Sequence, residues 1–133
     1  MKTLLNTHPL KIASALLLSV SLLGASCSKS SKKDFPRSIE VEYKVTSTSG
    51  LSKSSITYVN ETGGMSRIED AAIPFNKKLT INMTEATTIA LDAVSYSGGN
   101  AKLEIIADGK SVKSQTFSGT EIISGSIAYP VGY

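Results

Sequence analysis

Apolar and polar residues alternate along the chain from about residue 38 onward. In the segment SIEVEYKVTST every second residue is apolar: Ile39, Val41, Tyr43 and Val45. A period of two is typical of a β-strand with one buried face and one solvated face. The pattern therefore predicts a strand here, with its apolar side against a core.

Further segments have the same character and are separated by turn residues. They are SSITYVNE, MSRIEDAAI, KLTINMT, TIALDAVSYS, AKLEIIAD and TEIISGSIAY, the last of which we expect to end near Pro130. The sequence TGG at 62–64 ends one run, because glycine adopts positive φ without steric cost. Pro74 ends the next run, since proline cannot donate a hydrogen bond to a sheet.

Two hairpins are predicted within the second half of the chain. Asp108-Gly109 is a strong signal for a tight turn, because a type I′ turn needs positive φ at both central residues. The segment GGN at 98–100 predicts another hairpin, between the runs at 88–97 and 101–108. With seven or eight short antiparallel strands at this spacing, the predicted fold class is an all-β, immunoglobulin-like β-sandwich.

The segment Glu85–Val94 fits two kinds of secondary structure. Its apolar residues recur at helical spacing, while the β-branched residues at 87–89 and the Gly-Gly turn that follows favour a strand. We predict a strand.

The N-terminal segment resembles the signal sequence of a bacterial lipoprotein. Lys2 and Lys11 precede the apolar run Ile12–Gly24, which is shorter than the roughly 20 residues of a membrane-spanning helix. The following LGASC resembles a lipobox, in which the cysteine thiol is acylated and the chain is cleaved just before it. This makes Cys27 the predicted lipid anchor. The alternative is an ordinary signal peptide that leaves Cys27 as an unpaired thiol.

The chain thus divides into three parts. We predict a cleaved signal peptide at 1–26, a lipidated flexible tether at 27–37 and the β-sandwich domain at 38–133; removing 26 of the 133 residues leaves 107. The domain would be held at a membrane of the cell envelope through its lipid. Because SKSSKKD after the cysteine has no acidic run, we expect the domain to face the periplasm. The sequence leaves inner and outer membrane open.

Charge and composition narrow the function classes. The formal net charge of the whole chain is +3, but from Ser38 onward eight basic residues stand against ten acidic ones, which disfavours nucleic-acid binding. The one histidine, His8, lies in the signal peptide, and the mature part has neither tryptophan nor a free thiol once Cys27 is acylated. A Ser-His-Asp triad, a Cys-His pair and a histidine zinc site are therefore excluded. We predict a non-enzymatic protein without cofactor or metal.

A few charged residues are candidate sites. Glu69-Asp70 is interpreted as a solvated strand end, since neighbours on a strand point to opposite faces and form no catalytic dyad. Lys77-Lys78 is interpreted as an exposed strand start, with a contact patch as the alternative. Asp108 is predicted to serve its turn, because one Asp-Gly pair does not make a calcium loop.

The C-terminal segment YPVGY is aromatic. Tyr129 and Tyr133 either dock a partner or belong to an end strand that covers the core.

Four segments in one order carry a resemblance to a known family. They are VEYKVT at 41–46, ITYVNETGG at 56–64, Pro74-Phe75 and the DGK turn at 108–110. Over residues 39–127 the chain resembles the mycobacterial small membrane protein (MmpS) family. The resemblance implies a small all-β, immunoglobulin-like domain outside the membrane, acting as an accessory protein to RND-type lipid and siderophore exporters.

The chain departs from that family in two respects. Family members commonly have a transmembrane helix in place of a lipid anchor, and many have two cysteines where Leu103 and Gly125 stand here. A disulfide contributes stability rather than topology, so we expect the fold without it.

Two functions follow from these observations. The first is a non-enzymatic envelope lipoprotein that serves as an accessory or adaptor module. Its partner would be a membrane transport complex, such as an RND-type one, or another envelope complex. The domain would contact this partner through a sheet face or an open strand edge. The alternative is a periplasmic binding module that captures a small apolar ligand or a peptide strand. An apolar pocket between the sheets would favour the second.

Overall fold

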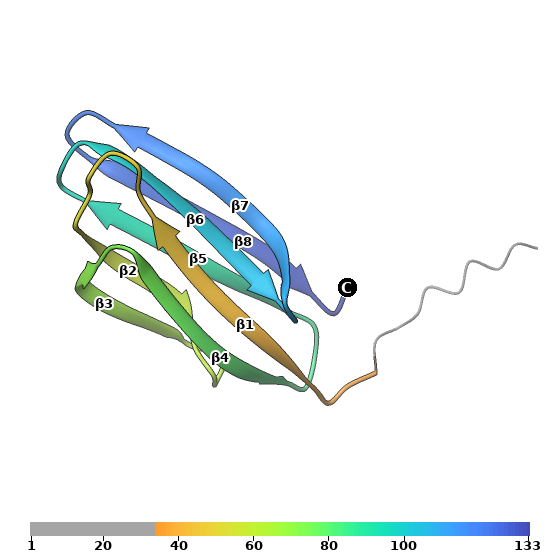
Figure 1. Ribbon diagram of the computed structural model, residues 1–133. Helices are drawn as coiled ribbons and strands as arrows, with labels where there is room; N and C mark the ends of the chain where they lie inside the picture. Colours follow the sequence, from red (N-terminus) through yellow and green to blue (C-terminus); the bar gives the residue numbers. More distant parts are fainter. Residues whose placement is uncertain (1–33) are drawn as a thin grey trace, which may run out of the picture. The chain divides into compact units, whose positions relative to one another are not determined.

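The computed structural model describes residues 34–133, which form eight antiparallel strands in two sheets (Figure 1). The all-β sandwich is therefore confirmed. In this part of the chain no helix is both long and apolar enough to cross a membrane. The strands are β1 (Arg37–Thr46), β2 (Lys53–Val59), β3 (Met65–Ala72), β4 (Phe75–Met83), β5 (Thr87–Ser95), β6 (Gly99–Ala107), β7 (Lys110–Gly119) and β8 (Ile123–Val131).

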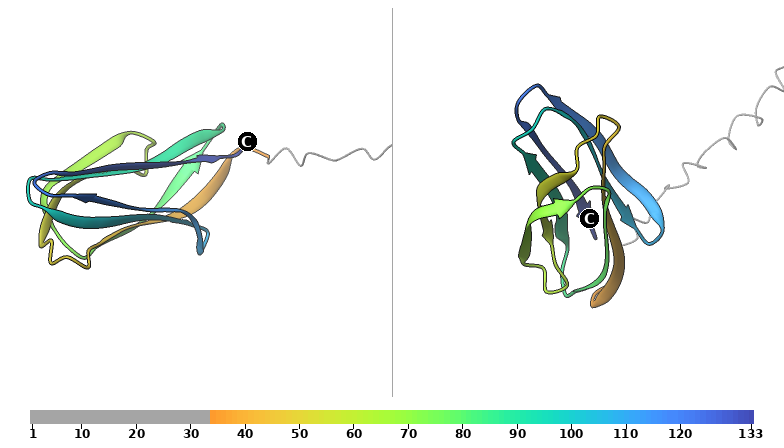
Figure 2. Two further views of the ribbon diagram at one scale, coloured as in Figure 1. Left: turned by 90° about the horizontal axis from the view of Figure 1, so that it is seen from above. Right: turned by 60° about the vertical axis from the view of Figure 1, so that its left-hand side comes forward.

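The strands are divided evenly between the sheets, which stack as two layers (Figure 2). Sheet A has the order β4-β1-β6-β7 and sheet B the order β3-β2-β5-β8. The order in sheet B is that of strands C′, C, F and G in immunoglobulin domains, and β1 pairs with β4 as strand B pairs with E. The hairpin of β6 and β7 occupies the place beside β1 that those domains give to their first strand.

The alternating pattern builds the core between the layers. Register places Val41 of β1 opposite Leu79 of β4 and Ala107 of β6, so that apolar residues of neighbouring strands share the inner face. These side chains are nearly or fully buried. Burying a side chain of the size of Val41 or Leu79 contributes on the order of 1.5–3 kcal/mol, before the entropy cost of ordering the chain.

A buried hydrogen bond joins the two sheets. The Tyr43 hydroxyl on β1 donates to the backbone carbonyl of Val59 on β2 over 2.9 Å, and the Tyr43 side chain is fully buried. Its ring lies 5.4 Å from that of Tyr58, centroid to centroid. Burial, with smaller contributions from Tyr58 and Glu61, raises the pKa of the Tyr43 phenol well above its usual value near 10. The phenol is therefore neutral and remains a donor across the neutral pH range.

The predicted GGN hairpin is wrong, because β5 and β6 belong to different sheets. Glycine is required at positions 98 and 99 because neighbouring loops approach the backbone closely there. A Cβ on Gly98 would lie 2.1 Å from the carbonyl oxygen of Thr120, and one on Gly99 would lie 2.2 Å from the Ser49 hydroxyl oxygen. The chain crosses between sheets at this point, packed tightly against two other loops.

The other local predictions agree with the structure. Asp108 and Gly109 have φ values of 48° and 77° and form the tight β6–β7 hairpin. The ambiguous segment is a strand, since β5 spans Thr87–Ser95. Strand β3 ends at Ala72, just before Pro74, and β8 ends at Val131.

The N-terminal boundary of the domain needs a small correction. Strand β1 begins at Arg37, and Phe35 packs against the core, so the ordered domain starts before Ser38 and includes the last residues of the predicted tether. The predicted signal peptide and Cys27 lie outside the described residues.

The cross-sheet hydrogen bond yields a test. The variant Tyr43→Phe leaves the Val59 carbonyl buried without a donor, which we expect to lower the free energy of unfolding by about 1–2 kcal/mol. Urea unfolding at pH 7 measures this change. The control Tyr96→Phe alters a side chain that is 81% exposed and should change the stability by less than about 0.5 kcal/mol.

The raised pKa adds a pH dependence. Because the folded protein holds the Tyr43 proton more tightly than the unfolded chain does, this contribution is complete below about pH 10 and is lost as the pH rises further. Stability should therefore fall less steeply above pH 10 in Tyr43→Phe than in the wild type. Equal slopes would contradict a buried Tyr43 phenol.

Candidate functional site

Both sheets are open, so four strands have an unpaired side. In residues 34–133, β4 and β7 border sheet A, and β3 and β8 border sheet B. An edge strand exposes backbone N–H and C=O groups that can pair with another chain. Natural sheets protect such edges with charged side chains, bulges or proline.

Edge strand β3 is protected by a bulge and by charge. Glu69 and Asp70 together oppose the single residue Ser55 on β2, and Asp70 has a φ of 50°. The acidic pair therefore lies at a bulge inside β3, and its predicted position at a strand end is wrong, although both residues are exposed. The Ser55 hydroxyl donates to the Glu69 carboxylate and, with Arg67, lowers the pKa of that carboxyl.

Edge strands β4 and β7 carry lysines. Lys77 lies opposite Tyr43, so it starts from the inner face of sheet A at the rim of the core, where it is half-buried. Its neighbour Lys78 points outward. Strand β7 contains Lys110 and Lys113, and Val112 is an extra residue that makes a bulge against β6. The prediction of an exposed strand start at Lys77-Lys78 thus holds for Lys78 alone.

Edge strand β8 has neither charge nor bulge, and its one protective residue, Pro130, lies near its C-terminal end. The segment IISGSIAYPVGY at 122–133 contains no Asp, Glu, Lys or Arg. Its pairing with β5 runs without a register shift from Ile123 opposite Ser95 to Val131 opposite Thr87. Among the four edges of the described domain, this regular and uncharged strand is the one open to another strand.

The position of Pro130 identifies the backbone groups on the open side of β8. Proline has no N–H, so within a paired edge strand its nitrogen faces away from the neighbouring strand. In an antiparallel sheet the N–H and C=O of one residue point the same way and alternate between residues. Ser124, Ser126 and Ala128 therefore direct both groups outward, and their small side chains are exposed.

The inner face of strand β7, in the opposite sheet, is partly uncovered. Lys113 and Gln115 lie opposite Ile105 and Leu103, whose side chains are fully buried on the inner face of sheet A. Residues directly opposite in a sheet share a face, yet Lys113 and Gln115 are exposed. The inner face of β7 is therefore uncovered over these two residues.

A close contact fixes where β7 meets β8. A Cβ on Gly125 would lie 2.3 Å from a ring carbon of Phe117, so the phenylalanine ring rests directly on the β8 backbone. Phe117 is partly buried against the core. The uncovered part of β7 and the open side of β8 adjoin this contact, and we call the two together the notch, defined by Lys113, Gln115, Ser124, Ser126 and Ala128.

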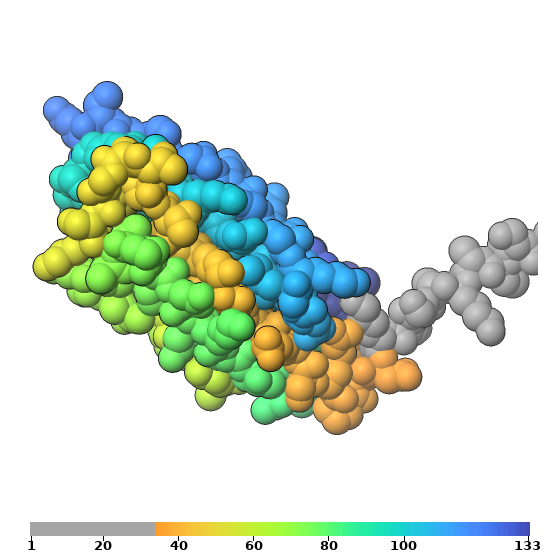
Figure 3. Space-filling model, viewed as in Figure 1, coloured from red at the N-terminus to blue at the C-terminus, as the bar shows by residue number. Residues whose placement is uncertain are grey.

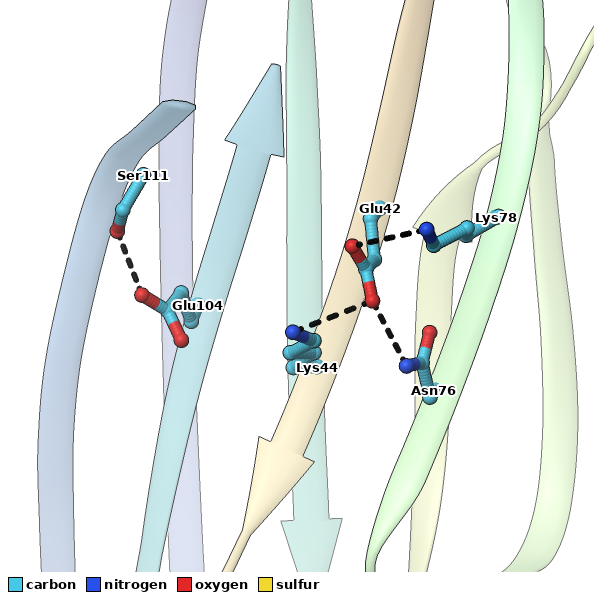
Figure 4. A network of polar contacts seen from close by, with 6 residues as sticks. All are labelled: Glu42, Lys44, Asn76, Lys78, Glu104 and Ser111. Atoms are coloured by element: carbon cyan, nitrogen blue, oxygen red, sulfur yellow. Dashed lines mark hydrogen bonds and ion pairs between the residues drawn. The ribbon is translucent and has the colours of Figure 1, made fainter. Parts of the chain in front are cut away.

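The outer face of sheet A carries a polar network. Figure 3 shows the side chains of β4, β1, β6 and β7 as adjoining bands on this face, and Figure 4 shows the network itself. The Glu42 carboxylate accepts a hydrogen bond of 2.7 Å from the Asn76 amide and lies 3.2 Å from the Lys44 ammonium and 3.6 Å from that of Lys78. The Asn76 bond and the two lysines lower the pKa of Glu42, against the effect of partial desolvation. These charges are engaged with one another and hold β1 to β4.

Two surface hollows are polar. One, of about 220 Å³, lies between the start of β2 and the end of β5. Its buried hydroxyls are already bonded to the backbone: Ser54 donates to the carbonyl of Val94 and Ser95 to that of Lys53. The other, of about 230 Å³, lies beside the β4–β5 turn. Neither has the apolar lining expected of a site for an apolar ligand.

The other candidate residues from the sequence lie in a turn, against the core or at the surface. One carboxylate oxygen of Asp108 accepts the Glu40 backbone N–H over 3.0 Å and the other lies 3.9 Å from Arg37, so this turn residue also binds the hairpin to β1. Tyr129 is partly buried against the core, while Tyr133 is exposed. Within residues 34–133 no three acidic, histidine or cysteine side chains gather into a metal site.

Asn60 has a role that the sequence analysis missed. Its side-chain oxygen accepts hydrogen bonds from the backbone N–H groups of Thr62 and Gly64, which shapes the β2–β3 turn. An Asn that begins a glycine-containing turn is the signal that would have identified it.

Two comparisons with known proteins were negative. A scan against models of protein families finds no match, and a search of curated proteins finds no significant match. The resemblance to the MmpS family stays an expectation from the sequence.

The polar network predicts a change in acid stability. Because the native pKa of Glu42 is lowered, its contribution is present above the unfolded-state value near 4.5 and is lost as the pH falls below it. In Glu42→Gln the free energy of unfolding should therefore decline less between pH 7 and pH 3 than in the wild type. Asn76→Ala should shift the decline in the same direction. An unchanged decline in both variants would contradict the network.

Proposed function

We propose that the chain is a non-enzymatic, lipid-anchored docking module of the bacterial cell envelope. Its uncharged β8 edge accepts an extended segment of a protein partner, which adds a strand to sheet B. The observation that carries this proposal is the contrast between three edges protected by charge or bulges and the β8 edge, which has only Pro130, near its end. The resemblance to the MmpS family supports the partner class, a membrane transport or other envelope complex, including an RND-type one.

The available backbone groups give the scale of such an interaction. Ser124, Ser126 and Ala128 offer three N–H and three C=O groups, and Pro130 adds a carbonyl. At about 0.5–1.5 kcal/mol each, these bonds supply roughly 4–10 kcal/mol, which the cost of association, about 4–15 kcal/mol, largely offsets. Backbone pairing alone is therefore weak. Side-chain contacts and the high local concentration at a membrane would complete the affinity.

The predicted anchor fits this arrangement. Phe35 follows Cys27 by eight positions, so the domain would remain within about 29 Å of an acylated Cys27. Phe35 contacts Gly132, which places the start of the domain and the end of β8 together (Figure 1). A partner segment near the membrane surface would lie within reach of the β8 edge.

The packing of the core favours docking over ligand capture. The inner faces are filled by buried Val, Ile, Leu and Tyr side chains, and the Tyr43, Tyr58 and Phe75 rings lie within 6.4 Å of their neighbours. An apolar molecule between the sheets would have to displace them.

Site-specific photo-crosslinking in cells tests the proposal. A photo-reactive residue at Ala128 of the acylated protein should give one discrete heterologous adduct, and the same residue at Thr80, exposed on the outer face of β4, should not. Adding Ser126→Pro, which removes an outward N–H, should reduce the adduct at least about tenfold, whereas Ser126→Ala keeps it. Cys27→Ser should release the protein from the membrane and weaken the adduct.

Three outcomes would contradict the docking proposal. They are equal adducts at Ala128 and Thr80, an adduct unaffected by Ser126→Pro in a folded protein, and an adduct of twice the protein's own mass. Circular dichroism and thermal unfolding of each variant show whether it is folded.

A further inference from the structure

We infer that the partner segment carries an acidic side chain that pairs with Lys113 in the notch. This inference rests on the proposed docking at β8 and specifies the chemistry of the segment. It joins the open backbone of β8 in one sheet with an uncovered lysine of β7 in the other.

The added strand would lie beneath the uncovered part of β7. Strand β8 packs against both β6 and β7 of the opposite sheet, but it leaves the inner face of β7 exposed at Lys113 and Gln115. In a strand added beside β8, every second side chain points to the inner face of sheet B. These inward side chains would occupy the space that leaves Lys113 and Gln115 exposed.

The charge of Lys113 is uncompensated in the domain. Among the described residues no carboxylate lies within ion-pair distance of it. The nearby acidic residues of sheet A are on the outer face, where Glu42 binds Lys44 and Lys78 and Glu104 accepts from the Ser111 hydroxyl (Figure 4). Lys113 starts from the inner face, so an inward carboxylate of the partner is its natural counterpart.

The order of residues along β7 gives the partner segment a pattern. Phe117, Gln115 and Lys113 follow one another at every second position and share the inner face. The inward positions of the added strand should therefore be apolar, polar and acidic in turn. The motif is apolar-x-polar-x-acidic, read from the Phe117 end of the notch.

A second copy of the chain does not supply this chemistry. Pairing of two β8 edges would bring the segment 122–133 of one copy beneath β7 of the other, and that segment has no acidic residue. Charge complementarity thus favours a different protein, whose segment is acidic at one inward position.

Selection from a displayed library of random nine-residue peptides tests the inference, with the purified full chain as target. Peptides selected on the wild type should contain Asp or Glu at one position, four residues from an apolar one. On Lys113→Glu the same position should turn to Lys or Arg. Lys102→Glu, an equal charge change on the outer face of β6, should select the wild-type pattern.

The binding of a single selected peptide then gives the size of the effect of Lys113 on affinity. It should bind Lys113→Glu at least about tenfold more weakly than the wild type, and changing its acidic residue to Lys should restore binding to that variant. Lys113→Gln, which removes the charge without reversing it, should lose less. Thermal unfolding confirms that each variant is folded.

The Ser126→Pro and Lys113→Glu variants distinguish docking at β8 from the inference about Lys113. Peptides that lose binding in Ser126→Pro but bind Lys113→Glu normally would overturn the acidic pattern and leave docking at β8 intact. Peptides that bind the Ser126→Pro variant as tightly as the wild type would overturn docking at β8 itself. Selected peptides without any common pattern would overturn the inference about Lys113. Self-association of the chain that displaces the peptides would overturn it too.

Discussion

The structure depends on a constraint common to every open sandwich: two sheets leave four strand edges, and each edge exposes backbone groups that other chains can pair with. Three edges of this domain carry lysines, acidic residues or bulges. The fourth, β8, is regular and uncharged, its exposed side chains at Ser124, Ser126 and Ala128 are small, and its only proline lies near its end. An unprotected edge is a liability unless it is used, and this contrast is the physical basis of the proposed docking function.

In the described part of the chain the sandwich is stabilised by packing and hydrogen bonds, without disulfide bonds. Residues 34–133 contain no cysteine. At the two positions where the family resemblance places cysteines, Leu103 is fully buried and Gly125 accommodates the Phe117 ring. The two sheets are instead joined by the Tyr43 hydrogen bond to Val59, at another place in the sandwich. The same Phe117–Gly125 contact sets the position of β7 above the notch.

Local features of the fold could be predicted from the sequence. Alternation identified the strands, and Asp108-Gly109 identified the β6–β7 hairpin, because both signals are carried by neighbouring residues. The GGN segment misled the prediction for a physical reason. Glycine is needed both in tight turns and where another backbone approaches closely, and the loops containing Ser49 and Thr120 approach it here.

The candidate site could not be predicted, because it depends on long-range topology. Which strands become edges follows from the pairing of β1 with β4 and β6, and of β2 with β5, over long sequence separations. The uncharged segment 122–133 is visible in the sequence, but only the topology makes it an edge. Likewise, Lys113 lies in a largely polar segment and looks like an ordinary solvated residue, and only the β6–β7 register places it on the inner face.

Residue-resolved amide hydrogen exchange of the isolated protein tests the central claim, that the β8 edge is open, most directly. The account predicts fast exchange at Ser124, Ser126 and Ala128 and slow exchange at Gly125, Ile127 and Tyr129, whose N–H groups face β5. Slow exchange at all six amides would mean that the edge is already covered, and would contradict the account.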